Sequence, residues 1–232
     1  MNGPELDTDS MKRPTVLVVA KAPVPGLAKT RVATTIGHEL AAELAAAALL
    51  DTLEAVSATG WPIVIAMTGD LGAAARGDEI CAAIAPFTVI EQRGKGLGER
   101  LATAHADADA GSGIVQIGMD TPQLSAVDLW AAGEALNNHD AVVGPAIDGG
   151  WWLLALRSAV HANILSTVPM SRPDTCRLTL RALTEAGADV GTIRPLSDVD
   201  HWADALVLAA DYPNLRMSAV VRRVADRQAV SR

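Results

Sequence analysis

The first loop of the sequence that could do chemistry gathers three cations around a rigid turn. Residues 21–26 read Lys-Ala-Pro-Val-Pro-Gly, and Lys29 and Arg31 follow shortly after. Proline fixes the backbone, Gly26 permits close approach of a ligand, and the cations can neutralise a diphosphate. The alternative is a stiff turn with solvated charges. A Walker A loop is excluded because no glycine directly precedes Lys29.

Carboxylates follow at three further places. Asp120 comes two positions after the predicted strand at 113–118 and could hold Mg²⁺ or Mn²⁺, which prefer oxygen ligands. Asp148 precedes two glycines and could orient or deprotonate a hydroxyl. Asp198 and Asp200 lie two positions apart near the end of the predicted domain, and either could be a second metal contact. Asp120 could instead belong to a turn that starts a helix, and Asp148 to a β-hairpin turn. Asp198 and Asp200 could belong to a solvated acidic loop.

A glycine-rich loop at 93–98 opens a predicted helix that carries Arg100. The glycine spacing differs from the dinucleotide-binding fingerprint, and the loop follows the third strand instead of the first. Gly96 could lie against a base or ribose, and Arg100 could reach a phosphate. A flexible loop at the start of a helix is the alternative.

Alternating strands and helices must position these loops. Apolar runs predict strands at 15–20, 62–67, 87–90, 113–118, 140–143, 151–156 and 190–193. Helices are expected at 38–57, 71–84, after 98, after a capping box of Ser125 and Asp128, at 174–186 and near the end of the chain. This order indicates an α/β fold with a mostly parallel central sheet and helices on both faces. Ligands of such sheets bind beyond the carboxyl ends of the strands, where most of these loops fall.

Composition limits the expected partners. The chain has 232 residues, of which 50% are hydrophobic, and its net charge is −8. Nucleic acid is not an expected partner, because a phosphate-tracking groove needs an excess of Lys and Arg. No membrane span and no secretory signal is recognised, so we expect a cytoplasmic protein. We expect a disordered tail at 1–13, a single domain at 14–225 and a loose end at 226–232.

Taken in order, these loops resemble those of a bacterial family of predicted GT-A-fold glycosyltransferases, formerly a domain of unknown function (DUF2064-like). The matching stretches are 20–31, 96–101, 118–124, 144–156 and 198–200. The family is similar to the nucleotidyltransferases of the molybdenum-cofactor and F420 pathways, which share its fold. The resemblance therefore implies a GT-A fold, that of the nucleotide-diphospho-sugar transferases.

The resemblance also implies roles for particular residues. The donor- or nucleotide-binding set is Lys21, Pro25, Gly26, Lys29, Arg31, Gly96, Arg100 and Gly118. Asp120 would bind the metal, with Asp198 or Asp200 as a second contact, and Asp148 and Asp120 are the expected catalytic residues. The expected acceptor side comprises Gly149, Gly150, Trp151, Trp152 and Ser171. The family often has Tyr where this chain has Trp151, and Trp-Ser-Thr where this chain has Met-Ser-Arg at 170–172.

The leading prediction is transfer of a sugar from a nucleoside-diphosphate sugar to a small-molecule acceptor, with Mg²⁺ or Mn²⁺ as cofactor. A nucleotidyltransferase would keep the fold, join a nucleoside triphosphate to a phosphorylated small molecule, and release pyrophosphate. A non-catalytic nucleotide-binding module is an alternative of another class. The acceptor and the oligomeric state, a homodimer included, stay open at this point.

Overall fold

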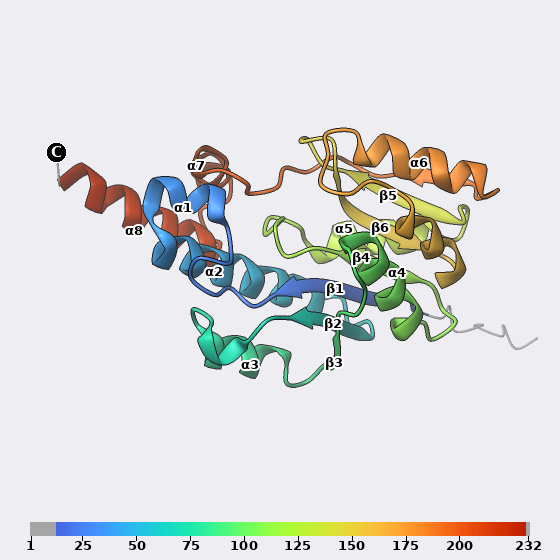
Figure 1. Cartoon of the computed structure of the whole chain (residues 1–232), viewed down its shortest axis with the longest axis horizontal. Coiled ribbons are helices and arrows are strands. Elements are labelled where there is room, and N and C mark those ends of the chain that lie inside the picture. Colours follow the sequence, from blue (N-terminus) through green and yellow to red (C-terminus); the bar gives the residue numbers. More distant parts are fainter. Residues whose placement is uncertain (1–12, 231–232) are drawn as a thin grey trace, which may run out of the picture.

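The computed structural model describes residues 13–230, and these contain a seven-stranded sheet (Figure 1). The strands are β1 (Thr15–Lys21), β2 (Ile63–Thr68), β3 (Thr88–Glu91), β4 (Ile114–Ile117), β5 (Ala141–Pro145), β6 (Trp151–Leu156) and β7 (Val190–Thr192). Their order is β3-β2-β1-β4-β6-β5-β7. Only β6 runs antiparallel to its neighbours in this described sheet, β4 and β5. The predicted mostly parallel sheet is confirmed.

Helices lie on both faces of the sheet. They are α1 (Thr30–Ile36), α2 (His38–Ser57), α3 (Gly77–Ile84), α4 (Leu97–Ala108), α5 (Ala126–Ala135), α6 (Thr175–Glu185), α7 (Trp202–Asp211) and α8 (Arg216–Val230). Two 3₁₀ helices, η1 (Leu71–Ala73) and η2 (Ala159–Ser166), complete the set. The helix expected at 71–84 is divided into η1 and α3, because Arg76 adopts a left-handed conformation with φ of 54°.

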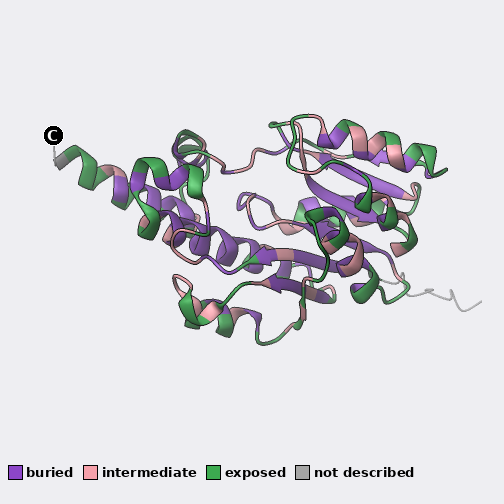
Figure 2. Cartoon of the chain, in the orientation of Figure 1, coloured by how far each residue is buried: buried purple, intermediate pink, exposed green. Residues whose placement is uncertain are grey.

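The core explains why β1 is apolar from Val16 to Ala20. Val16 and Val18 pack with Leu49 of α2 and Leu129 of α5, whereas Leu17 packs on the opposite face with residues of α4. Successive side chains of a strand point to opposite faces, so a strand covered on both sides is apolar throughout. Figure 2 shows the central strands as the buried centre of the molecule.

The last two helices pack on α1 and α2 instead of on the sheet. Asp51 of α2 accepts hydrogen bonds from the backbone N–H groups of Arg216 and Met217 at 2.9 and 3.0 Å, which fixes the start of α8. Helix α8 continues to Val230, so residues 226–230 are helical where a loose end was expected. The predicted tail lies outside the described residues, apart from Arg13. No described helix is both long and apolar enough to cross a membrane.

The sheet brings the chemically interesting loops together. Strands β1 and β4 are parallel neighbours, with Val18 opposite Ile117, so the loops that follow them leave from the same edge. The predicted capping box is present at the start of α5, where the backbone N–H of Ser125 donates to Oδ2 of Asp128 at 2.9 Å. The cluster described next therefore lies at the carboxyl ends of the central strands, as expected.

Candidate functional site

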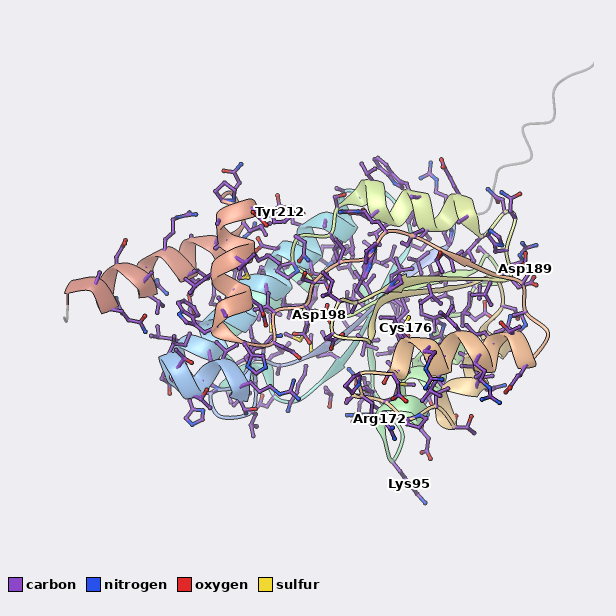
Figure 3. The ribbon with its side chains drawn as sticks, turned by 90° about the horizontal axis from the view of Figure 1, so that it is seen from above. Lys95, Arg172, Cys176, Asp189, Asp198 and Tyr212 are labelled. Atoms are coloured by element: carbon purple, nitrogen blue, oxygen red, sulfur yellow. The ribbon has the colours of Figure 1, made fainter. Side chains whose placement is uncertain are left out.

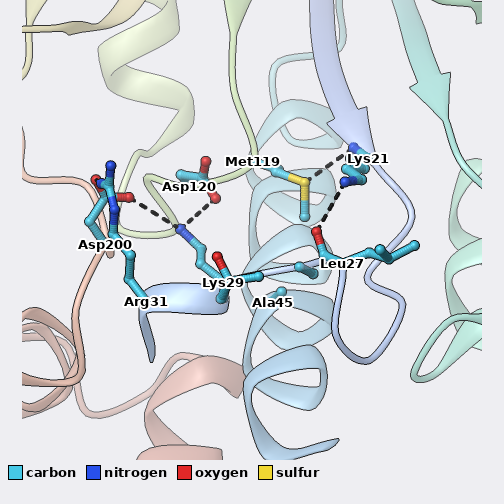
Figure 4. Close-up of a pocket in the computed structure, with 10 residues that line it drawn as sticks. Lys21, Leu27, Lys29, Arg31, Ala45, Met119, Asp120 and Asp200 are labelled. Atoms are coloured by element: carbon cyan, nitrogen blue, oxygen red, sulfur yellow. Dashed lines mark hydrogen bonds and ion pairs between the residues drawn. The ribbon is translucent and has the colours of Figure 1, made fainter. Parts of the chain in front are cut away.

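The ammonium group of Lys29 lies among oxygen atoms from two other segments (Figure 4). Its Nζ is 2.6 Å from Oδ1 of Asp120 and 4.0 Å from Oδ1 of Asp200. It also donates a hydrogen bond to the carbonyl oxygen of Val199. The side chain of Lys29 is 8% exposed, whereas that of Asp120 is 47% exposed. Lys29 therefore joins the first loop to two others, while Asp120 stays accessible from solvent.

Two backbone conformations place Lys29. Gly26 has φ of 79°, and Lys29 has φ of 46° directly before α1. A residue other than glycine in this left-handed region costs about 1–2 kcal/mol, and such strain concentrates at functional sites. Nζ of Lys21 donates to the carbonyl oxygen of Leu27 at 3.0 Å, which closes the loop on itself. The loop is therefore held in one shape before any ligand binds.

The segment before α7 is fixed to the loop after β4 by three hydrogen bonds. The hydroxyl of Thr121 donates to Oδ1 of Asp198 at 2.7 Å, and Nε2 of Gln123 donates to the carbonyl oxygen of Ser197 at 2.6 Å. The backbone N–H of Val199 donates to the carbonyl oxygen of Asp120 at 3.0 Å. These contacts hold the carboxylates of Asp120 and Asp198 in the same region.

Asp198 is a half-buried acid of the site. Burial, and then the negative charges of Asp120 and Asp148, raise its pKa to about 6, although the hydrogen bond from Thr121 and the charge of Lys29 act in the opposite direction. The carboxylates of Asp120 and Asp148 thus lie near enough to Asp198 for their negative charges to act on it.

This donor set fits a divalent cation that keeps part of its coordination shell for a ligand. Asp120 and Asp198 offer carboxylate oxygens, and a cation between them would relieve the crowding of negative charge. Within residues 13–230, no group of three or more His, Cys, Asp or Glu side chains is arranged to hold a metal. Mg²⁺ commonly takes only one or two carboxylates, together with substrate phosphates and water, so two are sufficient.

Asp200 faces the cations of the first loop. Its Oδ2 accepts a hydrogen bond from Nη1 of Arg31 at 2.8 Å. The side chain of Arg31 is 65% exposed, so this ion pair is a weak surface pair. The adjacent carboxylate of Asp204 accepts backbone N–H groups at the start of α7. Of the two carboxylates predicted as a second metal contact, Asp198 lines a cavity together with Asp120 and Asp148, whereas Asp200 pairs with Arg31.

The loop of Asp148 joins β5 to β6 and packs on the segment before α6. Oδ1 of Asp148 accepts the backbone N–H of Gly150 at 2.8 Å. A Cβ added at Gly149, where φ is 93°, would lie 1.8 Å from the carbonyl oxygen of Pro173, so no side chain fits there. The backbone N–H of Cys176 donates to the carbonyl oxygen of Gly149 at 2.9 Å. The loop of Asp148 and the segment at the start of α6 are therefore fixed to each other.

Three cavities meet at these side chains. The lysine cavity, of about 320 Å³, is lined by residues that include Lys21, Lys29, Arg31, Asp120 and Asp200. The tryptophan cavity, of about 280 Å³, is lined by residues that include Asp120, Asp148, Trp151, Trp152 and Asp198. The outer cavity, of about 620 Å³, is lined by residues that include Arg31, Asp148, Ser171, Asp198 and Asp200. Each pair of cavities shares a carboxylate, so the three are parts of one cleft.

Most of the predicted site residues border this cleft, and a few do not. Those that line it are Lys21, Lys29, Arg31, Gly118, Asp120, Asp148, Gly150, Trp151, Trp152, Ser171, Asp198 and Asp200. Those that line none of the three cavities are Pro25, Gly26, Gly96, Arg100 and Gly149. Gly26 and Gly149 shape the backbone instead. Nε of Arg100 is buried in α4 without a hydrogen-bond partner among the described residues, so its phosphate contact stays a prediction.

The roles of two residues of the cleft cannot be predicted from the sequence patterns. Thr121 donates a hydrogen bond to Asp198, which lies 77 positions later in the sequence. Arg172 borders both the tryptophan cavity and the outer cavity, although the sequence marks it only as a departure from the family. Both depend on packing between distant segments, which no local spacing reveals.

Comparison with known families agrees with the sequence pattern. Residues 50–172 match the family described as "Uncharacterized protein conserved in bacteria (DUF2064)", and this stretch is more than half of the chain. The chain belongs to this family. A comparison with curated proteins gave no significant match.

Solved structures of low sequence identity share the fold. A protein from Desulfovibrio desulfuricans G20, assigned only provisionally as a nucleotide-diphospho-sugar transferase, is 24% identical, with a TM-score of 0.82 over 94% of this chain and 98% of that chain. The 4-diphosphocytidyl-2C-methyl-D-erythritol synthase of Anaerococcus prevotii DSM 20548 is 11% identical, with a TM-score of 0.56 over 87% and 99%. Rv0371c of Mycobacterium tuberculosis H37Rv is 19% identical, with a TM-score of 0.53 over 87% and 100%. The chain therefore has the nucleotide-diphospho-sugar transferase fold, as the sequence predicts.

Proposed function

We propose that this protein is a metal-dependent transferase that moves a sugar from a nucleoside-diphosphate sugar to a small-molecule acceptor. The observation that carries the proposal is the meeting of Lys29, Asp120, Asp148 and Asp198, from four separate segments, around one cleft. The likeness to a provisionally assigned nucleotide-diphospho-sugar transferase supports the same reaction.

The lysine cavity is the proposed site of the donor diphosphate. Lys21, Lys29 and Arg31 line it and supply three positive charges. The exposed guanidinium of Arg31 can turn from Asp200 to a phosphate at small cost, because surface ion pairs contribute little. The ammonium of Lys29 is buried and remains beside Asp120, from where it shares the charge that develops on the leaving diphosphate.

Asp120 and Asp198 are the proposed ligands of Mg²⁺ or Mn²⁺. A bound ion supplies positive charge that stabilises the departing nucleoside diphosphate. Thr121 engages one oxygen of Asp198 and thereby orients the carboxylate. Asp200 is assigned to Arg31 and Lys29 instead.

Asp148 is the proposed base. The backbone N–H of Gly150 holds one of its oxygens, and its side chain borders both the tryptophan and the outer cavity. In the transfer, the acceptor oxygen bonds to the anomeric carbon while the bond from that carbon to the β-phosphate oxygen breaks. The acceptor proton passes to the carboxylate of Asp148, and the electron pair leaves with the nucleoside diphosphate.

A nucleotidyltransferase reaction is the second candidate, favoured by the likeness to a 4-diphosphocytidyl-2C-methyl-D-erythritol synthase. A phosphate oxygen of a phosphorylated acceptor would then attack the α-phosphorus of a nucleoside triphosphate, and pyrophosphate would leave. The same cations and carboxylates would serve both reactions, so the products must separate them.

The test is a melting-temperature screen of nucleoside-diphosphate sugars and nucleoside triphosphates with Mg²⁺, Mn²⁺ or a chelator. A ligand at about a hundred times its dissociation constant adds roughly 2.7 kcal/mol to the free energy of unfolding. A metal-dependent shift with a sugar nucleotide supports the proposal. A shift with triphosphates alone, followed by pyrophosphate release, supports the second candidate. Binding that a chelator leaves unchanged, without turnover of any donor, indicates a non-catalytic module and contradicts both.

A further inference from the structure

Arg172 lies in the segment between η2 and α6 (Figure 3). It borders two of the three cavities, the tryptophan cavity and the outer cavity. Among the described residues that line the tryptophan cavity, it is the one Lys or Arg, and it shares that cavity with Asp120, Asp148 and Asp198. An anion that binds beside three carboxylates needs a cation as its direct partner. On this side of the cleft, Arg172 supplies that cation.

The guanidinium of Arg172 is only partly engaged. Its Nε donates to Oδ1 of Asp174 at 3.1 Å, while the other carboxylate oxygen accepts Nη2 of Arg177 at 3.2 Å. Neither Nη atom of Arg172 donates to another group within residues 13–230. Arginine offers a planar fork of N–H donors that matches carboxylate and phosphate. The two Nη groups of Arg172 are therefore available to a ligand, while its Nε is held by Asp174.

The backbone around Arg172 is fixed in advance. The hydroxyl of Thr175 accepts the backbone N–H of Arg172 at 3.1 Å and donates to the carbonyl oxygen of Pro169 at 3.0 Å. Ser171 has a left-handed φ of 58°, and its side chain borders both cavities. Pro173 packs on Gly149, the neighbour of the proposed base. The arginine thus starts from a rigid turn next to the acceptor loop, which reduces the entropic cost of ligand binding.

We propose that the acceptor carries an anionic group, a carboxylate or a phosphate, which binds to Arg172 beside the hydroxyl of Ser171. This inference rests on the proposed function and specifies its acceptor. The donor diphosphate occupies the lysine cavity, the reacting hydroxyl lies near Asp148, and the acceptor anion binds at Arg172. The substrate class is therefore a hydroxy acid or a phosphorylated alcohol, in contrast to a neutral polyol.

Modification of arginine side chains by phenylglyoxal, read by peptide mass spectrometry, tests this on the whole protein with inorganic phosphate as the probe. At ten times its dissociation constant, phosphate should slow the modification of Arg172 roughly tenfold by mass action. Arg177 is the matched control, because it pairs with the same Asp174 but lines none of the three cavities. An unchanged rate at Arg172, or equal protection of both arginines, would overturn the proposal.

Two further experiments test whether the anion site at Arg172 is separate from the lysine cavity and which class of anion it binds. Protection of Arg172 should persist in Lys21→Gln, which weakens anion binding in the lysine cavity and leaves the other two cavities unchanged, because Lys21 lines neither of them. Loss of protection in that variant would contradict a separate site. Glycolate and glycerol 3-phosphate replace phosphate to distinguish the two anion classes, and failure of all three anions to protect Arg172 refutes the inference. The assay needs neither a donor nor turnover. A failed donor screen would therefore overturn the proposed function and leave the Arg172 result intact.

Discussion

Lys29 and Asp120 form an ion pair of 2.6 Å between the loop after β1 and the loop after β4. The pair is asymmetric, because the lysine is nearly buried and the aspartate is half exposed. The same ammonium donates to the carbonyl oxygen of Val199, so one cation fixes three segments of the cleft. Lys29 therefore contributes to the stability of the fold as well as to the charge of the site.

Lys29→Gln is expected to lower the free energy of unfolding by about 2 kcal/mol, because it removes charge-assisted hydrogen bonds from a buried position. Arg31→Gln is the control. That arginine is 65% exposed, so the variant should stay within about 0.5 kcal/mol of the parent. Urea denaturation of both variants measures the difference. Equal effects of the two substitutions would show that Lys29 is no more structural than Arg31.

Thr121→Val should destabilise the protein by about 1 kcal/mol, because the half-buried carboxylate of Asp198 loses its hydrogen-bond donor while the shape of the residue 121 side chain is kept. Thr121→Ser retains the hydroxyl and should preserve most of the stability. The difference in the free energy of unfolding between the two variants measures the contribution of the hydrogen bond. If serine and valine behaved alike, the Thr121–Asp198 contact would not hold the segment before α7.

Gly149→Ala should lower the free energy of unfolding more than Gly26→Ala does. Both glycines have positive φ, but only at Gly149 would a Cβ meet a backbone atom, the carbonyl oxygen of Pro173. We expect a loss of about 1 kcal/mol at Gly26 from conformational strain, and more than 2 kcal/mol at Gly149. Thermal unfolding gives the comparison, and a Gly149 variant as stable as the Gly26 variant would contradict the described contact.

The buried His105 predicts a pH dependence of stability. Its Nε2 lies 2.9 Å from Oε1 of Gln116, and burial lowers its pKa from 6.5 to about 4. The unfolded chain takes up a proton as pH falls through 6.5, whereas the folded chain does so only near 4. The free energy of unfolding should therefore drop by about 2 kcal/mol between pH 7.5 and pH 5 from this group alone, and level off below 4.

His105→Gln serves as the control for that pH dependence, because glutamine keeps a donor towards Gln116 and does not titrate. Urea denaturation of both proteins at pH 7.5 and 5 gives the difference between them, which cancels the contribution of the carboxylates. A parent and a variant with the same pH dependence would mean that His105 is protonated as readily in the folded chain as in the unfolded one.

The elements with a strong local pattern could be predicted from the sequence. Strand β1 has a continuous apolar run, and α2 has alanine and leucine at helical spacing over its full length, and both appear where expected. Helix α1 and the break at Arg76 were not foreseen, because a seven-residue helix has little periodicity and a left-handed arginine has no sequence signature.

The same distinction holds for the site. Lys29 and Asp120 were recognisable from the loops that carry them, at the ends of two clear strands. The partner of Asp198 and the position of Arg172 were not, since both arise when the loops after β4 and before α6 pack against distant segments. Residues of this kind become visible only once the fold brings them together.

The most direct test of the central claim is the affinity for Mn²⁺, measured by titration calorimetry with the nucleotide that the donor screen identifies. Asp120→Asn and Asp198→Asn should each weaken metal binding at least about tenfold, because each removes a carboxylate charge from a site that has only two. Asp189→Asn, an exposed aspartate paired with His139 outside the cleft, should bind Mn²⁺ as the parent does. Unchanged affinity in Asp120→Asn and Asp198→Asn would contradict the assignment of the cleft as a metal-dependent transferase site.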